Sequence, residues 1–272
     1  MLLSIFFSLN FFCQTQHSEE FAMIDSLMAV KKYAQAKSKA AWLTEEQIPD
    51  SISAKAHLYL GKIELLTGNL DLALSEYFEA LEFLKYLDAE DKANLFSGIG
   101  VVYSKSQNFD DAISNFKHAL QYAQQDINRL KILVNLGGVS MEAGKEQVPF
   151  IYAEALEIAK KLKEAGVEAI IYTNLSNYYL KKHSWQSAIE SANRSLSIRD
   201  SLKMPVSVIT LNNLGYALVN SGTINEGIKN YKKALEYANL SEKIQILYNL
   251  RSANIAAGEY QKAIQYYDRY DS

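Results

Sequence analysis

The sequence predicts an all-α fold built from about seven helix-turn-helix units. Only 12 glycines and 3 prolines occur in 272 residues, about half of the roughly 12% that these residues contribute to average proteins. Hydrophobic residues make up 49% of the chain, enough for a sizeable core. The chain also repeats itself with a period near 38 residues. A period of this length is typical of stacked helical hairpins, each of which buries its apolar stripe against its neighbours.

The second half of most units carries two small residues on one helix face, and in the last unit Tyr270 takes the second position. Ala73 and Ala80 stand seven positions apart, and seven residues make two helical turns. The same register recurs along the chain and predicts second helices over 31–43, 69–81, 108–120, 148–156, 184–196, 223–235 and 259–270.

The first half of most units places a small residue directly after a leucine or isoleucine, although Arg251 takes this position in the last unit. Gly61, Gly100 and Gly215 are examples, and a glycine lets another helix approach closely. Between the two halves, Gly68 and Asn108 predict a left-handed residue that ends the first helix. This pattern predicts first helices that contain 58–65, 97–104, 134–141, 173–180, 212–219 and 248–255.

Residues 96–120, FSGIGVVYSKSQNFDDAISNFKHAL, resemble a tetratricopeptide repeat. The resemblance extends over about residues 20–270, and the units look most like the extended-helix subgroup of kinesin light chains and related bacterial signalling proteins. It implies a right-handed superhelical solenoid over 17–272, whose first helices line a concave groove where ligands lie. The residues at the signature spacings are Phe96, Ile99, Gly100, Tyr103, Ala112, Phe116 and Ala119.

Four asparagines stand in register just before the apolar residue of successive first helices, at spacings of 39, 39 and 36 residues. An asparagine offers both a donor and an acceptor, which the main chain of an extended peptide requires. By resemblance, such asparagines hold peptide main chain; alternatively, the amides bond to neighbouring helices and stabilise the stack. With two residues about one turn further on, the predicted peptide-binding residues are Asn135, Asn174, Asn177, Asn213, Tyr216 and Asn249.

No motif for catalysis or cofactor binding is present in the sequence. The four histidines lie in different units without the i, i+4 spacing of a helical metal site. Gly98-Ile99-Gly100 lacks the third glycine of a dinucleotide loop. The net charge of −3, from 28 basic and 31 acidic residues, gives no basic face for nucleic acid. We therefore expect no catalytic residue, no metal, no cofactor, no nucleic acid and no small-molecule substrate.

The lysines near the expected inner face do not form a recognisable clamp for a terminal carboxylate. They are spread over separate units, and ordinary solvated charges are the alternative interpretation. The lysines considered are Lys55, Lys62, Lys105 and Lys181.

Residues 1–16, MLLSIFFSLNFFCQTQ, carry no charged side chain. Their apolar run is shorter than the roughly 20 residues that span a membrane and fits the hydrophobic region of a secretory signal, although no Lys or Arg precedes it. We expect 1–16 to be a signal peptide that exports the protein to the periplasm or cell envelope. The alternative is a first helix packed on the repeats of a cytoplasmic protein.

The expected function is that of a non-enzymatic scaffold or adaptor that holds a protein or peptide ligand in the groove. The alternative is the extracytoplasmic sensor module of a bacterial signalling protein, truncated at its C-terminus. No polar cap is visible at the last unit, where Tyr266, Tyr267 and Tyr270 suggest a partner or self-association.

Overall fold

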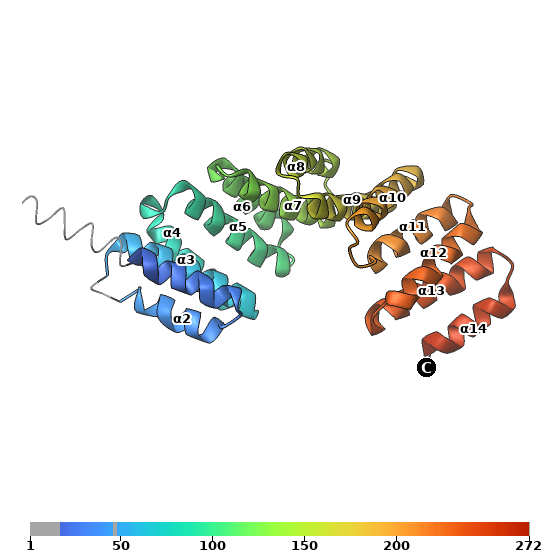
Figure 1. Ribbon diagram of the computed structural model, residues 1–272, viewed down its shortest axis with the longest axis horizontal. Coiled ribbons are helices and arrows are strands. Elements are labelled where there is room, and N and C mark those ends of the chain that lie inside the picture. The colour runs from blue at the N-terminus through green and yellow to red at the C-terminus, as the bar shows by residue number, and fades with distance from the viewer. Residues whose placement is uncertain (1–16, 46–47, 272) are drawn as a thin grey trace, which may run out of the picture. The chain divides into compact units, whose positions relative to one another are not determined.

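The computed structural model describes residues 17–45 and 48–271, except for the side chains of 267–271. This part of the chain forms α-helices joined by short turns, with one 3-10 turn at Leu84–Tyr86 and no β-strand. Two compact units, Met1–Val139 and Ser140–Ser272, divide the chain (Figure 1). The predicted signal peptide, residues 1–16, lies outside the described residues.

Unit 1 is a row of helical hairpins in which consecutive helices pack against each other. After the helix formed by residues 17–29, α3 packs on both α2 and α4, and α5 packs on α6. The first helices α3 and α5 also touch each other directly. The elements are α2 (Tyr33–Trp42), α3 (Asp50–Thr67), α4 (Leu70–Glu82), α5 (Ala89–Lys105), α6 (Phe109–Tyr122) and α7 (Asp126–Glu142), which ends beyond the boundary.

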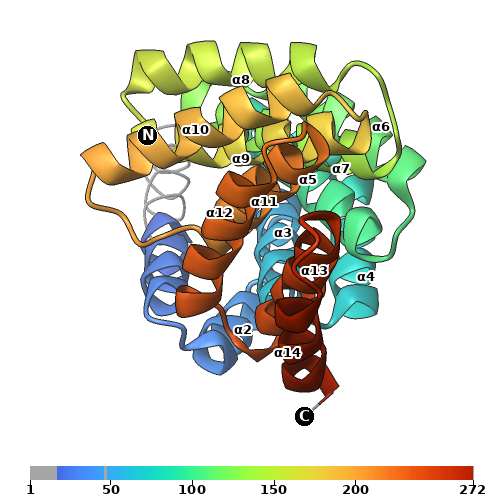
Figure 2. The same cartoon turned by 90° about the vertical axis from the view of Figure 1, so that its right-hand side faces the viewer.

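Unit 2 repeats this arrangement. The pairs α9 and α10, α11 and α12, and α13 and α14 form hairpins, and α11 contacts both α9 and α13. Figure 2 shows the orange to red helices α11 to α14 following one another. The elements are α8 (Val148–Leu162), α9 (Ala165–Lys181), α10 (Trp185–Ser201), α11 (Val208–Asn220), α12 (Ile224–Tyr237), α13 (Leu240–Ala256) and α14 (Tyr260–Asp271).

The predicted all-α array of helix-turn-helix repeats is confirmed, although the first helices are longer than their motifs. The helix α5 begins at Ala89, eight residues before the motif that starts at 97. Its start is fixed by the Asp88 side chain, which accepts a hydrogen bond from the backbone N–H of Asp91. A reciprocal capping box between Asn239 and Glu242 starts α13 in the same way.

The turns between the two helices of a repeat are left-handed, but not always at glycine or asparagine. Gly68, with φ of 89°, confirms the prediction. The prediction for Asn108 is wrong, because Gln107 is the left-handed residue, with φ of 59°. Asn108 instead stands at the N-cap of α6, where φ is −87°, so the residue before it must take the turn.

Glycines of the first helices pack against aromatic rings of the second helices. A Cβ placed on Gly61 would lie 2.5 Å from the Tyr77 ring, and one on Gly215 would lie 2.8 Å from the Tyr231 ring. Both tyrosines are only 1% exposed. The small residues therefore permit close approach, as expected.

The hairpin of α9 and α10 uses a different pair at the same positions. Ser176 replaces the glycine and Ala192 replaces the aromatic residue. The Ser176 hydroxyl donates to the Ala188 carbonyl at 3.0 Å, so the buried hydroxyl is satisfied. Where the first helix carries a residue larger than glycine, the second helix of this hairpin carries a residue smaller than an aromatic one.

Replacing Gly222 by alanine is expected to lower the free energy of unfolding by about 1 kcal/mol. Gly222 has φ of 94°, and nothing lies within 4 Å of a Cβ placed there, so the cost is conformational and not steric. Urea unfolding measures the change. The reverse substitution, Gln107→Gly, places glycine at a left-handed residue and should not destabilise. Equal stability of Gly222→Ala and the wild type would contradict this explanation.

Candidate functional site

A pocket opens in unit 1 between the first helices α3 and α5, with Tyr77 of α4 at its floor. Its volume is about 220 Å³. We call it the α3–α5 pocket, and its lining residues are Leu58, Tyr59, Lys62, Leu65, Tyr77, Asp91, Asn94, Ser97, Gly98 and Val101.

Gly98 is the residue that keeps this pocket open. A Cβ placed on Gly98 would lie 2.5 Å from both Cζ and the hydroxyl oxygen of Tyr77. The corresponding residue of α9, just before the apolar residue of its motif, is Asn174, which donates from Nδ2 to the Tyr152 hydroxyl at 3.1 Å. The side chain of Asn174 therefore covers the Tyr152 hydroxyl in unit 2. Gly98, at the corresponding position of unit 1, has no side chain and leaves the Tyr77 hydroxyl uncovered.

The two charged residues of the lining have opposite signs. The Asp91 carboxylate forms an ion pair with Lys55, with 3.1 Å between the charged atoms. Burial nevertheless raises the pKa of Asp91 above its usual value, and Lys55 opposes this shift only in part. The Lys62 ammonium lies 5.7 Å from the centre of the Tyr59 ring. The pocket therefore has little net charge.

Two further polar groups come from one face of α5. Asn94 and Ser97 are three residues apart, so their side chains are neighbours on the helix. The Asn94 Oδ1 atom accepts a weak hydrogen bond from Asn128 of α7 at 3.4 Å. Glu90 also joins α5 to the start of α7, because its carboxylate accepts from the backbone N–H groups at Gln124 and Gln125.

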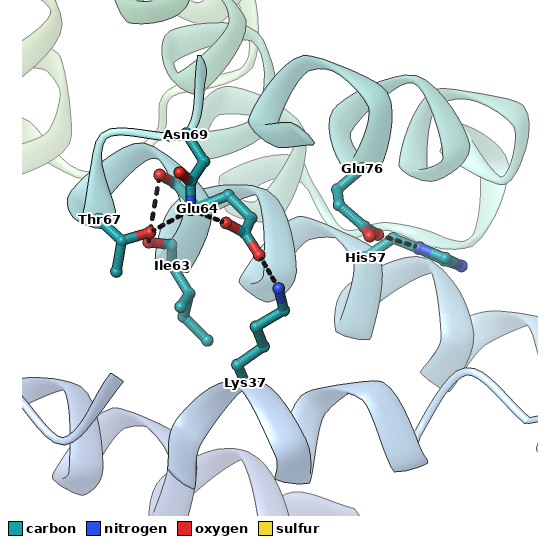
Figure 3. Close-up of polar contacts among 7 residues, drawn as sticks. All are labelled: Lys37, His57, Ile63, Glu64, Thr67, Asn69 and Glu76. Carbon is teal, nitrogen blue, oxygen red and sulfur yellow. Dashed lines mark hydrogen bonds and ion pairs between the residues drawn. The ribbon is translucent and has the colours of Figure 1, made fainter. Parts of the chain in front are cut away.

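A buried carboxylate, Glu64 of α3, connects the pocket's first helix to α2. The Glu64 side chain is 3% exposed and forms an ion pair with Lys37 of α2 (Figure 3). Asn69 donates from Nδ2 to the same carboxylate at 2.6 Å. Burial alone would raise the pKa of Glu64, but the bonds from Lys37, Asn69 and Thr67 outweigh it and hold this pKa below its usual value.

A second polar contact in Figure 3 joins α3 to α4. The Nδ1 atom of His57 lies 2.7 Å from a carboxylate oxygen of Glu76. His57 therefore joins α3 to α4 within unit 1. In the described part of the chain, no group of three or more histidine, cysteine, aspartate or glutamate side chains has the arrangement of a metal site.

The predicted peptide-binding asparagines lie in different surroundings. Asn135 is exposed on α7 and Asn177 is half-buried on α9. Asn174 is half-buried and bonded to Tyr152, as described above. Asn213 is 7% exposed, and its Nδ2 atom has no hydrogen-bond partner among the described residues.

Asn249 and Tyr216 complete the predicted set. Asn249 is buried and donates from Nδ2 to Oδ1 of Asn212 at 2.9 Å, which joins α13 to α11. Tyr216 is 41% exposed, and its ring meets the Trp185 ring edge-on. Asn174 and Asn249 thus make the contacts between helices that the packing alternative expects, while the binding role of the six residues stays a prediction.

Replacing Asn174 by alanine is expected to lower the free energy of unfolding by about 1 kcal/mol, because the buried Tyr152 hydroxyl loses its donor. The exposed Asn135 is the matched control, and Asn135→Ala should leave stability unchanged. Thermal unfolding of both variants tests this difference. Equal stability of the two variants would mean that the Asn174 contact contributes nothing to the stack.

The four lysines that the sequence analysis considered also lie in different surroundings. Lys55 is paired with Asp91, and Lys181 is paired with Glu142 at 2.9 Å. Lys62 lines the α3–α5 pocket, and Lys105 is exposed at the end of α5. The pocket itself was missed by sequence reasoning. Its signal is Gly98 at the position where later repeats carry asparagine.

At the C-terminal end, α14 leaves apolar side chains uncovered. Tyr260 is 64% and Ile264 is 54% exposed. Tyr266 is half-buried and packs against the core of unit 2, while the side chains of Tyr267 and Tyr270 lie outside the described residues. Among the described helices, none combines the length and apolarity needed to cross a membrane.

Comparison with known proteins identifies the repeats. Tetratricopeptide repeat family models match residues 52–125 and 212–272. Protein HGV2 of Halocynthia roretzi is 29% identical over 114 residues, which are 41% of this chain and 21% of that protein. The matched segment therefore spans about a fifth of this curated relative.

Two solved structures show the same fold. One is a signal transduction ATPase of Pyrococcus horikoshii with a tetratricopeptide repeat sensor, at 14% identity and a TM-score of 0.78, covering 95% of this chain and 42% of that one. The other is a tetratricopeptide repeat protein of Parabacteroides merdae, at 12% identity and a TM-score of 0.63, covering 94% and 93%. The family matches show that residues 52–125 and 212–272 are tetratricopeptide repeats, and the solved structures share the fold of this chain.

Proposed function

We propose that this protein is a non-enzymatic scaffold that holds a protein or peptide segment against its first helices. The α3–α5 pocket is the observation that carries the proposal. It lies between two successive first helices and combines apolar walls with a few hydrogen-bonding side chains, the composition typical of binding sites.

The lining suits an extended peptide. Leu58 and Val101 offer apolar surface, while Asn94 and Ser97 offer hydrogen-bond donors and acceptors. First helices of unit 2 also expose tyrosine side chains, of which Tyr216 and Tyr248 are 41% and 51% exposed. Tyrosine is enriched where proteins meet partners.

Photo-cross-linking from the pocket tests this proposal. A photoreactive amino acid at Asn94, exposed on α5, should capture a partner in the native cell, and mass spectrometry should map the product to the α3 and α5 face. The control places the same group at Lys117, which is exposed on the second helix α6. Capture from Lys117 with none from Asn94 would contradict a ligand on the first helices.

We also propose export, on the basis of the uncharged apolar residues 1–16. An exported array that binds a ligand could serve as a sensor module instead of an adaptor. Cell fractionation and the mass of the mature protein test export. A cytoplasmic protein that retains residues 1–16 would contradict it.

A further inference from the structure

Tyrosine hydroxyls that lie beneath the first helices differ in their hydrogen bonding between the two units. Tyr152 in unit 2 accepts a hydrogen bond from the carboxamide of Asn174. Tyr77 in unit 1 is 1% exposed and lines the α3–α5 pocket, but its hydroxyl makes no hydrogen bond to any residue that the structure describes. This hydroxyl opens onto the pocket, where a bound group can supply the hydrogen-bond partner that the described residues do not.

Burial raises the pKa of Tyr77, so the hydroxyl is a neutral phenol at physiological pH. It can donate one hydrogen bond and accept others. Gly98 leaves the path to this hydroxyl open, because any Cβ there would collide with it. A group from outside the chain can therefore take the place that the Asn174 carboxamide takes in unit 2.

We propose that the α3–α5 pocket accepts a carboxamide side chain, of glutamine or asparagine, from the bound protein segment. This inference rests on the proposed function and adds the chemistry that the site selects. The ligand's carboxamide takes the place of the asparagine side chain that later repeats carry at the position of Gly98, and it pairs with the Tyr77 hydroxyl.

The polar lining matches an uncharged group that both donates and accepts. The Tyr77 hydroxyl, the Ser97 hydroxyl and the Asn94 amide each have both capacities. A carboxylate ligand has no hydrogen to donate, and an ammonium ligand has no lone pair that could accept a hydrogen bond. A carboxamide has both capacities and carries no charge, which suits a lining whose two charged residues, Asp91 and Lys62, have opposite signs.

The apolar walls and the volume match the rest of such a side chain. Leu58, Leu65 and Val101 can cover the methylene groups. The pocket volume of about 220 Å³ is larger than the roughly 150 Å³ of a cavity that admits benzene, so a glutamine side chain fits. In the four units that follow Gly98, the corresponding residue is an asparagine of the chain itself.

Binding of defined peptide mixtures to the full chain tests the inference. The probes are nonapeptides with both ends blocked, eight randomised positions and a central Gln, Asn, Glu, Lys or Leu. Blocked ends remove terminal carboxylates from the comparison. The Gln or Asn mixture should bind about tenfold more tightly than the Glu, Lys and Leu mixtures, as expected for hydrogen bonds that only a carboxamide satisfies.

Three variants connect this preference to the pocket. Tyr77→Phe removes only the unpartnered hydroxyl and should abolish the preference. Tyr231→Phe is the matched control, because Tyr231 is equally buried in unit 2. The first helix that follows it, α13, carries Asn249 at the position that corresponds to Gly98. Tyr231→Phe should leave the preference unchanged. Gly98→Asn should also abolish the preference, because its Cβ displaces the Tyr77 hydroxyl and its side chain fills the pocket.

The outcomes separate the two proposals. A carboxamide preference that survives in Tyr77→Phe, or Glu-centred peptides that bind as tightly as Gln-centred ones, would overturn the subsite alone. Binding of all mixtures without preference would do the same and leave the scaffold proposal standing. No binding of any mixture to the wild type would count against both.

Discussion

Gly227→Ala is expected to lower the free energy of unfolding by about 1–3 kcal/mol. The backbones of α11 and α12 approach closely at Gly227 and Gly215. A Cβ on Gly227 would lie 2.8 Å from the Gly215 carbonyl oxygen and 2.5 Å from a methyl group of Val219. Relief requires the two helices to separate, because a backbone oxygen cannot rotate away as a side chain can.

Gly166→Ala is the matched control for this change. A Cβ on Gly166 meets only the terminal methyl of Met204 at 3.8 Å, an ordinary contact. Alanine also favours a helix over glycine by about 1 kcal/mol, so this variant should be as stable as the wild type or more stable. Urea unfolding of both proteins measures the difference. A Gly227→Ala variant as stable as Gly166→Ala would contradict the close approach.

Lys37→Met is expected to lower the free energy of unfolding by about 1–3 kcal/mol near neutral pH. It leaves the buried Glu64 carboxylate without its cation. Breaking a fully buried pair costs about 3–5 kcal/mol, but the Lys37 side chain is 50% exposed, so water moderates the loss. Lys262→Met removes the exposed pair with Glu259 and should cost less than about 1 kcal/mol.

The dependence of this effect on pH follows from the lowered pKa of Glu64. A carboxylate with a lowered pKa in the folded state contributes stability above its unfolded pKa, and this contribution is lost as the pH falls through the folded pKa. The stability difference between the wild type and Lys37→Met should therefore be large at pH 6.5 and shrink toward pH 3. Urea unfolding across this range tests it. A constant difference would mean that Lys37 does not act through the Glu64 charge.

The helical hairpins could be predicted because small residues recur at fixed spacings. The starts of the first helices could not be read from the same motif, because Asp88 and Asn239 fix them through caps far before it. The left-handed turn at Gln107 was also missed. Local propensity favours asparagine for that conformation, but the capping position of the next helix determined which residue took it.

The candidate site was less accessible to sequence reasoning than the fold. Four asparagines share one register, but the residues opposite them differ. Asn174 bonds to Tyr152 of the preceding second helix, whereas the corresponding residue of the second helix that precedes Asn213 is Ala192. The environment of each amide depends on the residue opposite it on another helix, which spacing along one chain does not reveal. The pocket at Gly98 depends on such a pairing as well, because it needs the glycine and Tyr77 together.

Amide hydrogen exchange of the full chain, alone and with the partner captured from Asn94, tests the central claim most directly. The claim is that the ligand lies on the first helices. We expect slower exchange in α3 and α5 upon binding, with α6 unchanged. Protection confined to α4 and α6 would contradict the account and place the partner on the second helices.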